Sequence, residues 1–81
     1  MARVILLPPF AGDWFGGRGE LEVGAGNLFA LVRALDTLAP GFAEAAEAGA
    51  AIAINGSAVG DWTTALVSDD EVMFVPKVAG G

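Results

Sequence analysis

The last five residues of the chain become steadily smaller toward the C-terminus and end in Gly80-Gly81. Glycine has no Cβ atom, so a glycine pair lets the backbone enter a narrow channel. The terminal carboxyl group has an ordinary pKa of about 3.5 and is therefore an anion at neutral pH. Such a carboxylate could attack the α-phosphate of ATP on a partner enzyme and form an acyl-adenylate. The chain end is thus the first candidate for chemistry, with simple flexibility as the alternative.

Other reactive residues are weaker candidates. Asp69, Asp70 and Glu71 stand together, but a catalytic carboxylate pair needs one buried member, and a turn before a strand is usually solvated. The hydroxyl groups have no histidine to act as a base, because the chain contains 0 His. Gly24 and Gly26 precede a helix pattern without the third glycine of a dinucleotide-binding fingerprint, so they indicate a turn. We therefore expect no catalytic side chain.

Composition excludes several classes of function. With 81 residues the chain is one small domain, and with 0 Cys it has neither disulfides nor the usual zinc sites. The net charge of −6 argues against binding to nucleic acid or to an anionic membrane, and it suits a basic partner surface. No apolar run approaches the ~20 residues of a membrane span, and Pro8 and Pro9 interrupt the N-terminal apolar stretch. We expect a cytoplasmic protein without metal or cofactor.

Strand patterns lie at both ends of the chain. Residues 2–7 and 71–75 are rich in β-branched and aliphatic side chains, and residues 20–23 alternate polar with apolar. Asn55-Gly56 between apolar flanks is a strong β-hairpin signal. The two most apolar strands, the first and the last, should lie side by side, parallel and in the centre of the sheet.

One helix pattern stands between the strand pairs. Asn27 is a plausible N-cap for a helix over residues 28–38, and residues 42–49 could add further turns. The apolar residues that recur at helical spacing in the first segment are Leu28, Leu31, Val32, Leu35 and Leu38. Residues 10–19 contain four glycines and are expected to form a loop. Its Trp14-Phe15 pair is either a lid over the core or an exposed anchor for a partner.

Alternation along the last strand predicts two different faces. Val72 and Phe74 should point to the core beneath the helix. Met73 and Val75 should then lie on the opposite face, together with Leu7 and Val59. An exposed apolar patch of this kind marks a protein interface.

The C-terminal half resembles the ubiquitin-like β-grasp sulfur carriers, above all the small subunit of molybdopterin synthase (MoaD-type). Typical members have an acidic turn that leads into EV-x-F-x-PPV-x-GG, and this chain has SDDEVMFVPKVAGG. The residues that match this pattern are Glu71, Val72, Phe74, Pro76, Val78, Gly80 and Gly81. Lys77 stands where the family has its second proline, so the tail should be less stiff.

The resemblance implies a fold and a function. The fold is α+β, a β-grasp of residues 1–76 whose mixed four- or five-stranded sheet packs on one main helix, with residues 77–81 as a flexible tail. An E1-like adenylyltransferase (MoeB-type) with ATP would adenylate Gly81, and a sulfur donor would convert it to a thiocarboxylate. The large synthase subunit (MoaE-type) would receive the sulfur for molybdopterin. The chain itself would be a non-catalytic subunit.

The expected partner-binding residues are Leu7, Val59, Met73, Val75, Lys77 and Val78, and Gly80 and Gly81 form the reactive end. Three alternatives remain. The sulfur could go to the thiazole of thiamin or to another sulfur-containing product. The chain could be a ubiquitin-like protein modifier that forms isopeptide bonds through Gly81. It could also be a β-grasp interaction module with an inert tail.

Overall fold

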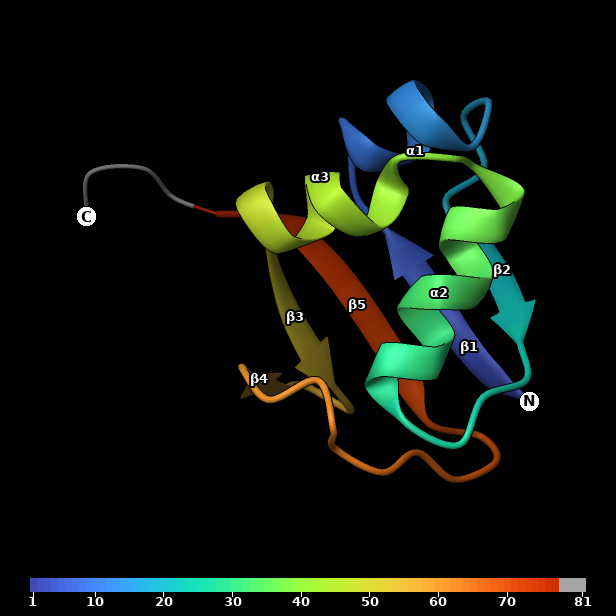
Figure 1. Ribbon diagram of the computed structural model, residues 1–81, viewed down its shortest axis with the longest axis vertical. Coiled ribbons are helices and arrows are strands. Elements are labelled where there is room, and N and C mark those ends of the chain that lie inside the picture. The colour runs from blue at the N-terminus through green and yellow to red at the C-terminus, as the bar shows by residue number, and fades with distance from the viewer. Residues whose placement is uncertain (78–81) are drawn as a thin grey trace.

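The computed structural model describes residues 1–77, which form one mixed sheet and three helices. The strands follow the order β2-β1-β5-β3-β4 across the sheet (Figure 1). The elements in chain order are β1 (Ala2–Leu6), α1 (Phe10–Trp14), β2 (Glu20–Val23), α2 (Leu28–Leu38), α3 (Phe42–Gly49), β3 (Ala50–Ile54), β4 (Ser57–Val59) and β5 (Glu71–Pro76).

The two terminal strands form the centre of the sheet, as the sequence predicts. β1 and β5 run parallel, with Val4 beside Val72 and Leu6 beside Phe74. β2 pairs with β1, and β3 pairs with β5, both antiparallel. This arrangement confirms the predicted β-grasp, here with five strands.

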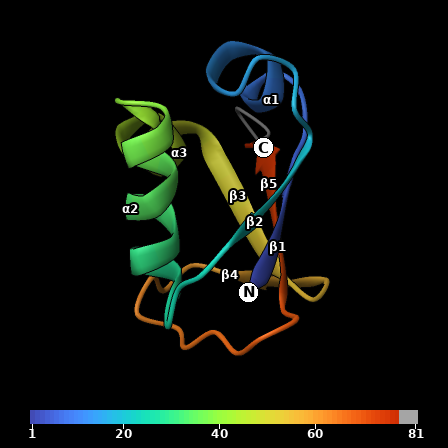
Figure 2. The same cartoon turned by 90° about the vertical axis from the view of Figure 1, so that its right-hand side faces the viewer.

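Helices α2 and α3 cover one face of the sheet, and the core lies between the two layers (Figure 2). Asn27 caps α2, because its side-chain Oδ1 accepts a hydrogen bond of 2.7 Å from the Ala30 N–H. The fully buried large side chains are Phe42, Phe74, Leu28, Leu31, Leu35, Val4, Val32 and Val72. Leu38 does not join the apolar stripe as its spacing predicts and is 66% exposed. It is the last residue of α2, and the residues that continue the core after it are Ala39 and, in α3, Phe42.

The expected loop over residues 10–19 contains a short helix instead, α1. Phe10 and Ala11 are buried in it, and the Phe10 ring meets the Phe42 ring edge to face at 6.2 Å. The rings of Trp14 and Phe15 also lie edge to face on Phe42, at 6.1 and 5.1 Å. Burial of these rings thus outweighs the poor helix propensity of a glycine-rich segment. Trp14 and Phe15 are half-buried against the core, which supports the lid interpretation rather than the exposed anchor.

The hairpin at Asn55-Gly56 fixes the register of β4. Both residues have positive φ, 50° and 84°, as a two-residue turn of this type requires. The turn places Val59 opposite Ile52, whose side chain is buried on the helix side of the sheet. Directly opposed residues share a face, so Val59 points toward the helices. The expectation that it lies with Met73 and Val75 is wrong.

Candidate functional site

The face of the sheet opposite to α2 and α3 is open, since no helix of the described chain packs on it (Figure 2). Alternation along the strands gives this face a continuous apolar strip, with Met73 between Ile5 and Ala53, and Val75 beside Ala51. Leu7 follows the inward-facing Leu6 and is half-buried. We call this surface the open face; its apolar residues are Ile5, Leu7, Ala51, Ala53, Ala58, Met73 and Val75.

The open face has one charged end. Arg3 pairs in register with Glu71 on one side and Glu22 on the other. Its guanidinium group donates a hydrogen bond to the Glu71 carboxylate and lies 3.6 Å from a Glu20 oxygen. The bond to Glu71 and the surrounding negative charge raise the pKa of Arg3 above its ordinary value. The carboxylates outnumber the arginine, so this end of the face is acidic and suits a basic partner residue.

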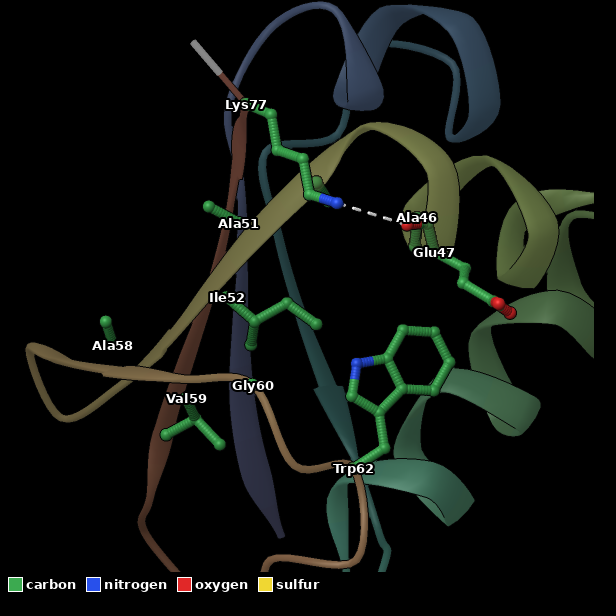
Figure 3. A pocket seen from close by; sticks show the side chains of 10 residues that line it. Ala46, Glu47, Ala51, Ile52, Ala58, Val59, Gly60, Trp62 and Lys77 are labelled. Carbon is green, nitrogen blue, oxygen red and sulfur yellow. Dashed lines mark hydrogen bonds between the residues drawn. The ribbon is translucent and has the colours of Figure 1, made fainter. Parts of the chain in front are cut away.

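The opposite end of the open face is where the described chain stops. β5 carries Met73 and Val75 toward Pro76, and Lys77 follows. The Lys77 N–H donates a 2.9 Å hydrogen bond to the Gly49 carbonyl, and its Nζ lies 3.4 Å from the Glu47 carbonyl oxygen (Figure 3). The expected site residues Val78, Gly80 and Gly81 lie outside the described residues.

The acidic turn before β5 has a structural role. Asp70 accepts hydrogen bonds from the Asn55 side-chain amide (2.9 Å) and the Val67 N–H (2.8 Å), and Asn55 Oδ1 accepts one from the Glu71 N–H (2.9 Å). The bonds from Val67 and Asn55 lower the pKa of Asp70. The turn therefore ties the start of β5 to the β3–β4 hairpin. Among residues 1–77 no polar or charged side chain is buried, and no group of acidic side chains could hold a metal ion.

A groove of about 450 Å³ lies on the helix side, between α3 and the β3–β4 edge (Figure 3). Ile52, Val59 and the half-buried Trp62 give it an apolar wall, and Lys77 lies at its rim. No sequence pattern pointed to Trp62. The sequence did contain the signal for Val59, because a two-residue Asn-Gly turn sets Val59 opposite Ile52.

The structure brings together only part of the expected site. Leu7, Met73 and Val75 share the open face, whereas Val59 lines the groove on the other side. Lys77 lies at the end of β5, against α3. Ile5 and the alanines of β3 and β4 on the open face were not among the expected site residues, although the same alternation along the strands indicates them. No helix among residues 1–77 has the length and apolar character needed to cross a membrane.

Solved structures share this fold over nearly the whole chain. CysO from Mycobacterium tuberculosis is 21% identical, with a TM-score of 0.84 over 96% of this chain and 100% of the other. A chain of the BexX/CysO complex from Amycolatopsis orientalis is 17% identical, with a TM-score of 0.84 over 100% of both chains. These two likenesses concern the fold.

A third structure is a complex of subunits 1 and 2 of the molybdopterin-converting factor from Helicobacter pylori 26695. The matching chain is 25% identical, with a TM-score of 0.70 over 99% of this chain and 97% of the other. No curated protein sequence matches the chain significantly. The model of the ThiS family matches residues 17–81, which include β2 to β5 and the C-terminal end.

Proposed function

The chain belongs to the ThiS family of ubiquitin-like sulfur carriers, and on that basis we propose that it carries sulfur as a thiocarboxylate on Gly81 for the synthesis of molybdopterin. The observation that carries the proposal is the open face, a bare apolar surface that extends along β5 to the residue from which the tail continues. We place this function in the cytoplasm. The chain contributes its own C-terminus as the reacting group.

The chemistry has two steps on the partner enzyme. A carboxylate oxygen of Gly81 attacks the α-phosphorus of ATP, and pyrophosphate leaves to give an acyl-adenylate. A hydrosulfide equivalent from a sulfur donor then attacks the carbonyl carbon, and AMP leaves to give the thiocarboxylate. The adenylating partner is an E1-like enzyme (MoeB-type), and the acceptor is the large synthase subunit (MoaE-type). Transfer of the sulfur and addition of water return Gly81 to a carboxylate.

The open face supports a docking role for both partners. Its apolar end, with Leu7 and Val75, lies nearest to the tail, and its acidic end, with Glu22 and Glu71, lies farthest away. A partner that places an apolar surface on the first and a basic residue on the second is held in one orientation. The Helicobacter pylori relative forms a complex with a second subunit, as expected of a carrier that docks on its acceptor.

A second candidate acceptor is the thiazole of thiamin or another sulfur-containing product. The family match over residues 17–81 favours this class as much as molybdopterin, because the carrier chemistry on Gly81 is the same. Incubation of the thiocarboxylated chain with each acceptor enzyme distinguishes them. The correct acceptor discharges the sulfur, and the other leaves the thiocarboxylate intact.

The decisive test concerns Gly81. The chain is incubated with a MoeB-type enzyme, ATP and a sulfur donor and weighed by mass spectrometry, and we expect a gain equal to sulfur in place of oxygen. Deletion of Gly81 moves the carboxylate by roughly 3.5 Å. Because a misplacement of ~1 Å can cost about a hundredfold in rate, deletion and a one-residue extension should both abolish the gain.

Both altered chains should keep their melting temperature, since the change lies outside the core. A deleted chain that gains sulfur as fast as the intact one would refute the carrier function. So would an intact chain that stays unmodified while the same enzyme modifies its own cognate carrier. A higher-mass adduct on other proteins would instead favour the modifier alternative.

A further inference from the structure

We propose that Lys77 is a positioning residue for the reaction at Gly81: it clamps the start of the tail to the C-terminal end of α3. This inference rests on the proposed function, because it concerns how the tail is presented to the adenylating partner. Lys77 is an expected partner-binding residue, but its two hydrogen-bond donors, the backbone N–H and Nζ, are directed to the chain itself.

The backbone contact is the last backbone hydrogen bond of the described chain. Pro76 pairs in register with Ala50, so the antiparallel pairing of β5 with β3 brings Lys77 opposite Gly49, the last residue of α3, where its N–H can add one more bond to the ladder. The Lys77 N–H does so, at 2.9 Å from the Gly49 carbonyl oxygen. A second proline at this position, as in the sequence pattern that the chain resembles, could not donate this bond. At this position the chain has a backbone hydrogen bond to α3, whereas the family pattern has the rigid ring of a proline.

The side-chain contact uses the charge of α3. The last carbonyl groups of a helix lack partners within the helix and carry partial negative charge. α3 has no basic residue in its own last turn, and it carries the carboxylates of Glu44 and Glu47. The Lys77 ammonium group, 3.4 Å from the Glu47 carbonyl oxygen, supplies the missing cation from the residue that follows β5 (Figure 3).

The clamp matters for the step that follows docking. The open face holds the partner, whereas the clamp sets the position and direction from which residues 78–81 continue. If the clamp opens, the partner should bind as tightly as before, but a smaller fraction of complexes would have the carboxylate in the active site. The effect should therefore fall on kcat of adenylation rather than on KM for the carrier.

Three variants test this: Lys77→Glu, which repels the end of α3; Lys77→Arg, which keeps the cation; and Arg33→Glu, a matched charge reversal on the exposed surface of α2. Amide hydrogen exchange at residue 77 is measured in the unbound chain, and kcat and KM are measured with a MoeB-type enzyme and ATP. We expect Lys77→Glu to lower both the amide protection and kcat by about two- to fivefold, as the loss of a cation at a helix end predicts.

Lys77→Arg should restore kcat and protection, Arg33→Glu should change neither, and all melting temperatures should stay within about 4 °C. A wild-type amide at residue 77 that exchanges as fast as in an unstructured peptide would overturn the proposal. A rise in KM with unchanged kcat would overturn it too, because Lys77 would then contact the partner. If the wild-type chain is not adenylated at all, the proposed function fails, while the exchange measurement still tests the clamp.

Discussion

The two faces of β5 carry similar apolar side chains but differ in how far these side chains are buried. Val72 and Phe74 are completely buried under α2 and α3, whereas Met73 and Val75, one residue away, are only half-buried. Hydrophobicity along the strand therefore does not separate core from surface in this molecule. What separates them is the cover, because α2 and α3 pack on one face and no helix of residues 1–77 packs on the other.

The two faces also differ in shape. On the covered side the Phe42 ring meets four other aromatic rings edge to face, at 5.1 to 6.2 Å, in an arrangement that fixes each ring. On the open side the five strands present no aromatic residue; away from the charged end, their side chains are aliphatic residues, alanines and one methionine. A flat aliphatic surface that includes a methionine can adapt to more than one partner. A carrier that must bind both an activating enzyme and an acceptor needs this property.

The largest effect is expected on the covered face. Phe42→Ala removes the ring on which α1, α3 and β5 converge and should lower the free energy of unfolding by about 3–5 kcal/mol. Phe29→Ala removes a ring of α2 that is 48% exposed and should cost only about 0.5 kcal/mol. Urea denaturation followed by circular dichroism measures both. Equal losses in the two variants would show that the covered face is not the core.

An intermediate effect is expected on the open face. Met73→Asp or Leu7→Asp places a charge where a partner should exclude water, so affinity for the MoeB-type or MoaE-type partner should fall at least about tenfold. Folding should survive, because both side chains lie outside the core. Thermal melts and a binding titration on the same samples test this. A variant that unfolds while its folded fraction binds normally would mean that the faces are inverted.

The smallest effect concerns the register of β5, which determines which of its side chains lie on each face. A slip of one residue in β5 would exchange Phe74 with Met73 or Val75, and the hydrogen bonds of the Asn55 side chain with Asp70 and with the Glu71 N–H oppose it. Because the pKa of Asp70 is lowered in the folded state, its contribution is present above about pH 4 and is lost as the pH falls through the folded pKa. Stability should therefore fall less between pH 6 and pH 3 in Asp70→Asn than in the wild type.

Denaturant midpoints across this pH range measure the difference. Asp61→Asn is the matched control, since hydrogen bonds from Thr63 lower the pKa of Asp61 in a turn away from β5. It should flatten the pH dependence in the same direction without changing amide exchange in β5. Parallel pH curves for the wild type and Asp70→Asn would contradict the role of Asp70.

Strong local patterns were enough to predict most of the fold. Helix α2 follows from the spacing of Leu28 and Leu35, and the central parallel pair follows from two strongly apolar strands. The open face at Met73 and Val75 follows from alternation alone. These features are predictable because each depends on several residues that repeat one period.

The failures have two physical causes. α1 exists because Phe10 and Trp14 pack on Phe42, a contact between segments about thirty positions apart that no local pattern records. Val59 was placed on the wrong face because Ser57–Val59 is too short to show an alternation of its own. Its facing is set by the turn at its start and by the partner strand. The contacts of Lys77 with the Gly49 and Glu47 carbonyl groups likewise join segments far apart in the sequence, so no local pattern indicates them.

The parallel pairing of β1 with β5 has a consequence for the order in which the molecule assembles. Arg3 and Glu71 are partners although they lie 68 positions apart, so this pairing closes a loop of most of the chain. Helix α2 and the β3–β4 hairpin need only local contacts and can form before it. The open face spans β1, β5 and β3, and it is therefore completed only when this slowest pairing is made. A partner that docks on that face accepts the tail only from chains that have finished folding.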